Sequence, residues 1–163
     1  MTVTEPDIVA IKNEIITILK TNAEIWQEDN HEKGFQAINL ELPVEAEFMG
    51  LSYPICFVAN DNQLENDKVF GPAVAGQITG STHEFQFRIL FFEQGAESAE
   101  VEISLDGYYK QIKQTLKENH ALNSVQGVRT SFPHRGHSFN FGEFEGKAID
   151  GRVIILKVTV DSN

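Results

Sequence analysis

The sequence has little of three things: cysteine, positive charge and long apolar runs. Its single cysteine, Cys56, excludes a disulfide bond within the chain. There are 13 Lys and Arg residues against 24 Asp and Glu, a net charge of −11, and such a chain is a poor partner for phosphate backbones. The longest aliphatic or aromatic runs, 89–92 and 153–156, fall far short of the ~20 residues of a membrane helix. We therefore expect neither specific nucleic-acid binding nor membrane insertion.

The amino terminus has no basic stretch followed by an apolar one, so we expect no secretory signal and synthesis in the cytoplasm. The 163 residues suffice for one sizeable hydrophobic core and are too few for two ordinary domains. We expect a single domain that spans residues 1–163.

Two segments, 8–19 and 99–119, have apolar residues at the spacing of three and four that marks one face of a helix. Lysines gather toward the end of the second segment, where they suit the negative end of a helix dipole. Gly107 interrupts that segment and makes a bend or break there an open alternative. The apolar residues that carry the two patterns are Ile8, Ile11, Ile15, Ile18, Leu19, Val101, Leu105, Ile112 and Leu116.

The other apolar segments are short or alternate with polar residues, which predicts strands. Segment 35–53 fits two short strands, or one strand broken at Pro43. The expected later strands cover 53–59, 83–93, 125–129, 139–144 and 152–160, with turns at Gly136, Gly146 and Gly151. Both helices would then pack on one face of a mostly antiparallel or mixed sheet, an α+β fold with a long loop between strands.

The strand 83–93 is polar on one face at its start and apolar on both faces at its end. Leu90 and Phe92 supply the second apolar face, which must be covered. A neighbouring subunit or a loop of the same chain would serve. The first alternative makes Leu90 and Phe92 a candidate subunit interface.

Residues 60–81 contain few large apolar side chains and many turn-forming residues, and they predict a long loop. A loop of this length is usually functional or disordered. Val69, Phe70 and Pro72 are its candidate anchors for docking on another subunit or partner, and a plain mobile insertion is the alternative.

No catalytic or cofactor pattern stands out. Cys56 lies inside an apolar run and is interpreted as a core residue. His134 and His137 are close enough for a metal, but a site needs further ligands that the sequence does not specify, so we interpret them as loop histidines. We expect no enzymatic activity, no cofactor and no metal.

The order of elements resembles the tail terminator, or tail completion, proteins of long-tailed phages and related viruses. The landmarks are the helix 8–19, the strand 53–58 (YPICFV) followed by an acidic loop, and the strand 84–92. They continue with a helix that closes in 112–122 (IKQTLKENHAL) and the final strand 151–160 (GRVIILKVTV).

The resemblance implies a structural virion protein that is made in the host cytoplasm and resides in the tail and neck. Such proteins form a ring, commonly a homo-hexamer, on the head-proximal end of the tail tube. The ring ends tube growth and joins the tail to head-closure proteins, while DNA passes through its lumen. The alternatives are another neck or tail-tube component, or an α+β domain that binds a small ligand or acts as an enzyme.

Overall fold

The computed structural model describes residues 7–22, 24–26, 35, 37–39, 53–60, 66–70, 80–144 and 146–162. Within these residues, two helices, a short 3₁₀-helix and six strands form the fold. In chain order these are α1 (Ile8–Lys20), β1 (Ala37–Asn39), β2 (Ile55–Asn60), β3 (Asn66–Phe70), β4 (Gly80–Gly95), α2 (Ser98–Glu118), η2 (Leu122–Gly127), β5 (Val128–Phe144) and β6 (Lys147–Ser162).

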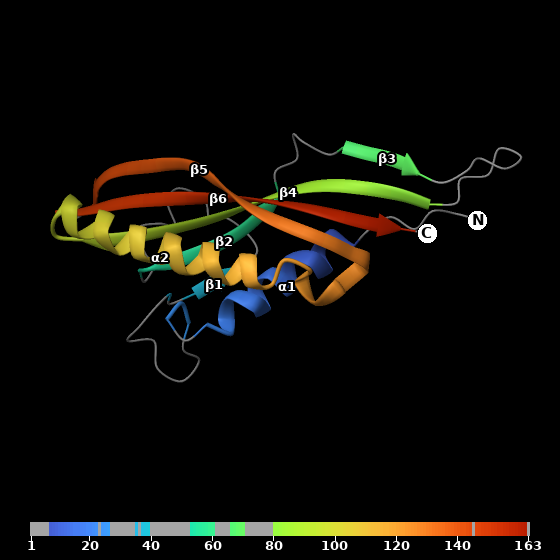
Figure 1. Ribbon diagram of the computed structural model, residues 1–163. Helices are drawn as coiled ribbons and strands as arrows, with labels where there is room; N and C mark the ends of the chain where they lie inside the picture. Colours follow the sequence, from blue (N-terminus) through green and yellow to red (C-terminus); the bar gives the residue numbers. More distant parts are fainter. Residues whose placement is uncertain are drawn as a thin grey trace, which may run out of the picture.

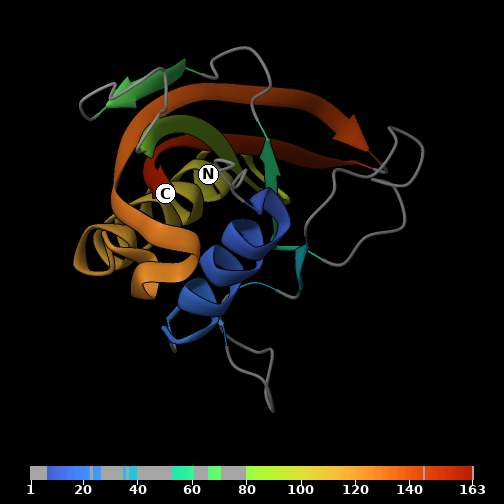
Figure 2. The same ribbon diagram turned by 90° about the vertical axis from the view of Figure 1, so that its right-hand side faces the viewer.

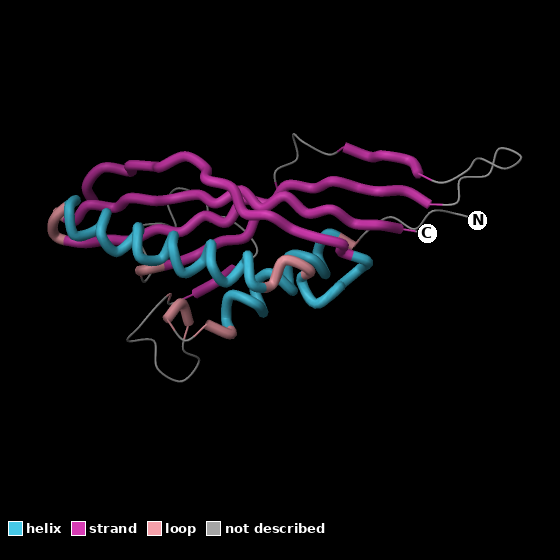
Figure 3. The backbone as a smooth tube through the Cα atoms, viewed as in Figure 1, coloured by secondary structure: helices cyan, strands magenta, loops and turns pink. Residues whose placement is uncertain are grey.

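The six strands form one sheet in the order β1-β2-β4-β6-β5, with β3 also paired to β4. β1 and β2 run parallel, and the other pairs are antiparallel. β6 pairs with β4 over almost its whole length, while β2 and β3 share the opposite edge of β4. The three long strands β4, β6 and β5 lie side by side (Figure 3) and give the molecule its elongated shape.

Both helices lie on one side of the curved sheet (Figures 1 and 2), which confirms the α+β prediction. Asp7 caps the start of α1: its carboxylate accepts a hydrogen bond of 3.1 Å from the Ala10 N–H and so satisfies one of the unpaired donors of the first turn. The Asn22 side-chain amide donates to Thr115 Oγ1 at 2.8 Å and ties the end of α1 to α2.

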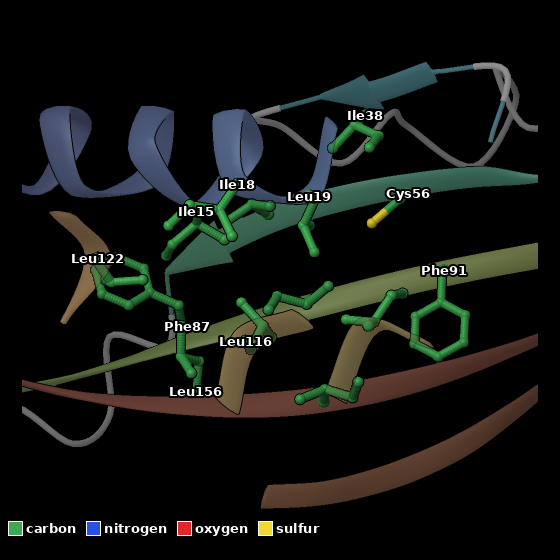
Figure 4. Packing of buried hydrophobic residues seen from close by; sticks show 14 of the residues in the cluster. Ile15, Ile18, Leu19, Ile38, Cys56, Phe87, Phe91, Leu116, Leu122 and Leu156 are labelled. Atoms are coloured by element: carbon green, nitrogen blue, oxygen red, sulfur yellow. The ribbon is translucent and has the colours of Figure 1, made fainter. Parts of the chain in front are cut away.

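The main hydrophobic core fills the space between the helices and the sheet. Figure 4 shows Ile15, Ile18 and Leu19 of α1 close to Cys56 of β2 and Phe87 of β4. The apolar residues whose spacing predicted the two helices are the ones that the helices bury. They are Ile11, Ile15, Ile18, Leu19, Val101, Leu105, Ile112 and Leu116. α2 runs through Gly107 without a break. In the described part of the chain, no helix is long and apolar enough to cross a membrane.

The last third of the chain forms two long strands, so the prediction of three strands was wrong. Gly146 lies between β5 and β6 with a φ of +76°, and this left-handed conformation is the reason for glycine there. Gly136 and Gly151 lie inside strands and make no turn. They mark close packing: a Cβ on Gly136 would be 2.8 Å from the Val153 carbonyl oxygen, and one on Gly151 would be 2.5 Å from the Phe92 ring.

The segment 60–81 is not a loop throughout. Asn60 ends β2, Gly80 begins β4, and β3 lies between them. Its five residues pair with the first residues of β4, a backbone pairing that its polar composition does not predict. Within segment 35–53, β1 confirms one short strand, whereas Pro43 lies outside the described residues.

Substitution of the two glycines Gly151 and Gly107 should have opposite effects on stability. Gly151→Ala puts a methyl group against the buried Phe92 ring, and we expect it to lower the free energy of unfolding by about 1–3 kcal/mol. Gly107→Ala places its new Cβ in open space in the middle of α2. Because alanine favours a helix more than glycine does, this variant should raise the free energy of unfolding by about 1 kcal/mol. Urea denaturation measures both. Equal effects of the two variants would contradict the packing described for Gly151.

Candidate functional site

Leu90 and Phe92 belong to a second, smaller hydrophobic cluster on the face of the sheet away from the helices. Ile55, Phe57 and Val153 complete its buried part. Leu90 is 4% exposed and Phe92 1% exposed in the single chain. The side chains of Leu90 and Phe92 are therefore buried without a second subunit. This agrees with the alternative in which the same chain covers them. A subunit contact through these two side chains stays a prediction, and it requires that the cover move.

Of the three candidate docking residues, two lie in a strand and one lies outside the described residues. Val69 and Phe70 are the last residues of β3, opposite Ser81 and Gly80 of β4. Pro72 lies outside the described residues. The backbone at Val69 and Phe70 is thus held by the sheet, and docking through their side chains stays a prediction.

Cys56 is fully buried in the main core, and this burial raises the pKa of its thiol well above the ordinary value. A thiol that stays protonated is a poor nucleophile and a poor metal ligand, which fits the interpretation of Cys56 as a core residue. Over the residues with a described position, no group of three or more His, Cys, Asp or Glu side chains could hold a metal ion.

The structure brings together a set of cationic and aromatic side chains that sequence reasoning did not recognise as a site. We call it the basic surface. Its members are Lys110, Lys113 and Lys117 of α2, Phe132 and His134 of β5, and Lys157 of β6. The three helix lysines are three and four residues apart and so occupy adjacent turns.

Two hydrogen bonds hold the end of α2 against β5. The N–H and the hydroxyl of Ser131 both donate to the His120 carbonyl oxygen, at 2.6 and 2.9 Å. This anchor places Lys117 Nζ 5.8 Å from the centre of the Phe132 ring, within range of a cation–π interaction. Phe132 is nevertheless 54% exposed, so a large apolar surface is open to solvent among positive charges.

The strand pairing adds a further charge to the basic surface. Lys157 lies directly opposite Phe132 in the sheet register. The centres of the Phe132 and His134 rings are 5.0 Å apart. On the helix side, Lys113 Nζ lies 5.5 Å from the centre of the Tyr109 ring. A hollow of about 530 Å³ runs along this end of α2 and is lined by Tyr109, Lys110, Lys113, Gln114, Lys117 and Glu118.

The electrostatics of the basic surface act on His134. Partial burial lowers the pKa of His134, and the positive charges of Lys157 and Lys113 lower it further. The folded chain therefore binds a proton at His134 less readily than the unfolded chain does. Stability from this residue is present above pH ~6.5 and is lost as the pH falls below that value.

The lysines of α2 were recognised in the sequence, but only as residues suited to the helix end. Spacing within the helix could have indicated their common face. Their proximity to His134 and Lys157 depends on the strand pairing and on the packing of α2 against β5, which no local pattern specifies.

No protein-family model matches the chain, and no curated protein matches it with significance. The functional conclusion consequently depends on the order of the elements and on the surfaces described above.

Truncation of Phe92 tests whether this residue is part of the core or of a subunit contact. Because its ring is buried in the single chain, Phe92→Ala should cost about 3–4 kcal/mol of unfolding free energy. The loss should be the same at low and high protein concentration in chemical denaturation. A loss that appears only at concentrations where the protein associates would show instead that Phe92 is covered by a second copy.

Removal of the charge of Lys157 should raise the pKa of His134 toward 6.5, because one of the two repelling ammonium groups is lost. Titration of the His134 ring by NMR measures the shift in Lys157→Gln. The matched control is Lys147→Gln at the other end of β6, about 33 Å away along the strand. An unchanged His134 pKa in Lys157→Gln would contradict the electrostatic coupling.

Proposed function

We propose that the protein is a tail terminator of a long-tailed virus. In this function, copies of the chain form a ring on the head-proximal end of the tail tube. The ring ends the growth of the tube and presents a surface to the head-closure proteins.

One observation supports the proposal: each of the five landmark segments forms the kind of element expected of it, as α1, β2, β4, α2 and β6. They also belong to one fold. The buried residues of all five segments contribute to the main core, so the landmarks pack together as one unit.

The charge of the chain is compatible with a ring through which DNA passes. A net charge of −11 per chain repels the phosphates of DNA. An acidic lumen would let the genome slide without adhering, and the DNA would be cargo in transit and not a bound partner.

Deletion of the gene from the virus that encodes the chain tests the proposal. We expect tails of uncontrolled length and few joined particles, measured as the distribution of tail lengths in electron micrographs of lysates. The wild-type chain supplied in trans should restore uniform tails and joined heads. Lys147→Gln is a suitable control because this exposed side chain at the start of β6 lies outside the core and the basic surface, and this variant should restore them as well.

Uniform tails joined to heads in the absence of the gene would overturn the proposed function. Tails of normal length that remain separate from heads would point to the alternative of a head-closure component.

A further inference from the structure

The outward side of α2 carries opposite charges in its two halves. The first half exposes Glu100, Glu102 and Asp106 around Ile103, and we call this group the acidic surface. The second half contributes the lysines of the basic surface. The helix therefore presents a negative and a positive region on one exposed element.

The two regions share one side of the helix. Ile103, Lys110 and Lys117 are seven residues apart, a spacing of about two turns that keeps them on one stripe. The stripe of Val101, Leu105 and Ile112 is buried against the sheet. Figure 1 shows α2 lying along the sheet with its other side uncovered by any described element.

Each charged region also exposes a large apolar side chain. Ile103 is 74% exposed in the acidic surface, and Phe132 is 54% exposed in the basic surface. A surface that mixes like charges with an exposed apolar residue matches a second surface of opposite charge with an apolar residue of its own. The two surfaces of this chain are complementary in both respects.

Within one chain the two surfaces can meet only at their border, where Asp106 lies one turn before Lys110. Ile103 and Lys117 are separated by about 21 Å along the axis of a continuous helix. The described partner of the acidic surface is Arg152, whose guanidinium lies 3.8 Å from Asp106. Complementarity between Ile103 with its acidic neighbours and Phe132 with Lys117 can therefore be used only between two molecules.

We propose that the occupant of the basic surface is the acidic surface of a second copy of this chain. The inference rests on the proposed function, because a ring needs a contact between copies, and it names the side chains that make that contact. Carboxylates of Glu102 and Asp106 in one copy would face Lys110 and Lys117 of the next, with Ile103 against Phe132.

The free edge of β5 is a poorer place for such a contact. Pro133 lacks the N–H that a further strand would need, and the pairing of β5 with β6 shifts register at three places. Proline and bulges at an edge prevent the addition of a strand from another molecule. The helix surface has no such obstacle.

Long-range repulsion between acidic copies does not prevent the contact. At physiological ionic strength charges are screened over about 8 Å, so copies with a net charge of −11 can approach. Opposite charges that touch at the interface then add attraction over a shorter distance.

Charge reversal on either side of the contact tests the proposal. The first variant combines Lys110→Glu with Lys117→Glu, and the second combines Glu102→Lys with Asp106→Lys. Each should weaken self-association at least about tenfold in sedimentation velocity at about 0.15 M salt. An equimolar mixture of the two variants should associate again, since each then meets an opposite surface on the other.

The matched control for the first variant is Lys20→Glu with Lys147→Glu, which changes the net charge equally at exposed lysines outside both surfaces. It should associate as the wild type does. Circular dichroism of every variant establishes that it is folded before association is compared.

The proposal is overturned if folded variants associate as the wild type does, if their mixture fails to associate, or if the wild type stays monomeric up to about 1 mM. It is also overturned if a short DNA duplex binds the wild type at the basic surface and the first variant loses that binding without any change in self-association. If the charge-reversal variants associate as the wild type does and also restore normal tails to a virus that lacks the gene, the contact is refuted and the proposed function stands. A mixture restored only to dimers would support the contact and refute the ring.

Discussion

The structure depends on one constraint: the end of β4 is apolar on both faces and must be covered twice. Phe87, Ile89 and Phe91 face the helices, while Leu90 and Phe92 face the other way. β6 occupies one edge of β4, and β2 and β3 occupy the other, so the strand is also central in the sheet. Burial of its aromatic side chains supplies a large share of the apolar area removed from water, and the helices are positioned by that requirement.

The cover on the helix side determines which surface remains for a partner. One stripe of apolar residues on α2 is buried in the core. The opposite stripe is exposed and carries charged side chains and Ile103. The anchoring of Ser131 to the His120 carbonyl oxygen then places Phe132 and His134 of β5 beside the helix lysines. The same packing that buries β4 thus assembles the basic surface, and we propose that assembly of copies uses it.

Local patterns predicted much of the fold, because burial here follows helical and strand periodicity closely. α1, α2 and β4 end within a few residues of their expected limits. The errors had two causes: glycine has two physical uses, and some features depend on contacts between distant segments. Gly136 and Gly151 were interpreted as turns, but they permit close packing inside strands. β3 was missed because its stability comes from pairing with β4. The basic surface was missed because it joins side chains from three separate elements.

Native mass spectrometry of the wild-type protein over a range of concentrations tests the central claim most directly, since it counts the copies in each complex. The account predicts a closed oligomer of more than two copies, with one dominant stoichiometry that is lost when Lys110 and Lys117 are both changed to Glu. A protein that remains monomeric throughout, or an open series of complexes with no preferred number of copies, would contradict it.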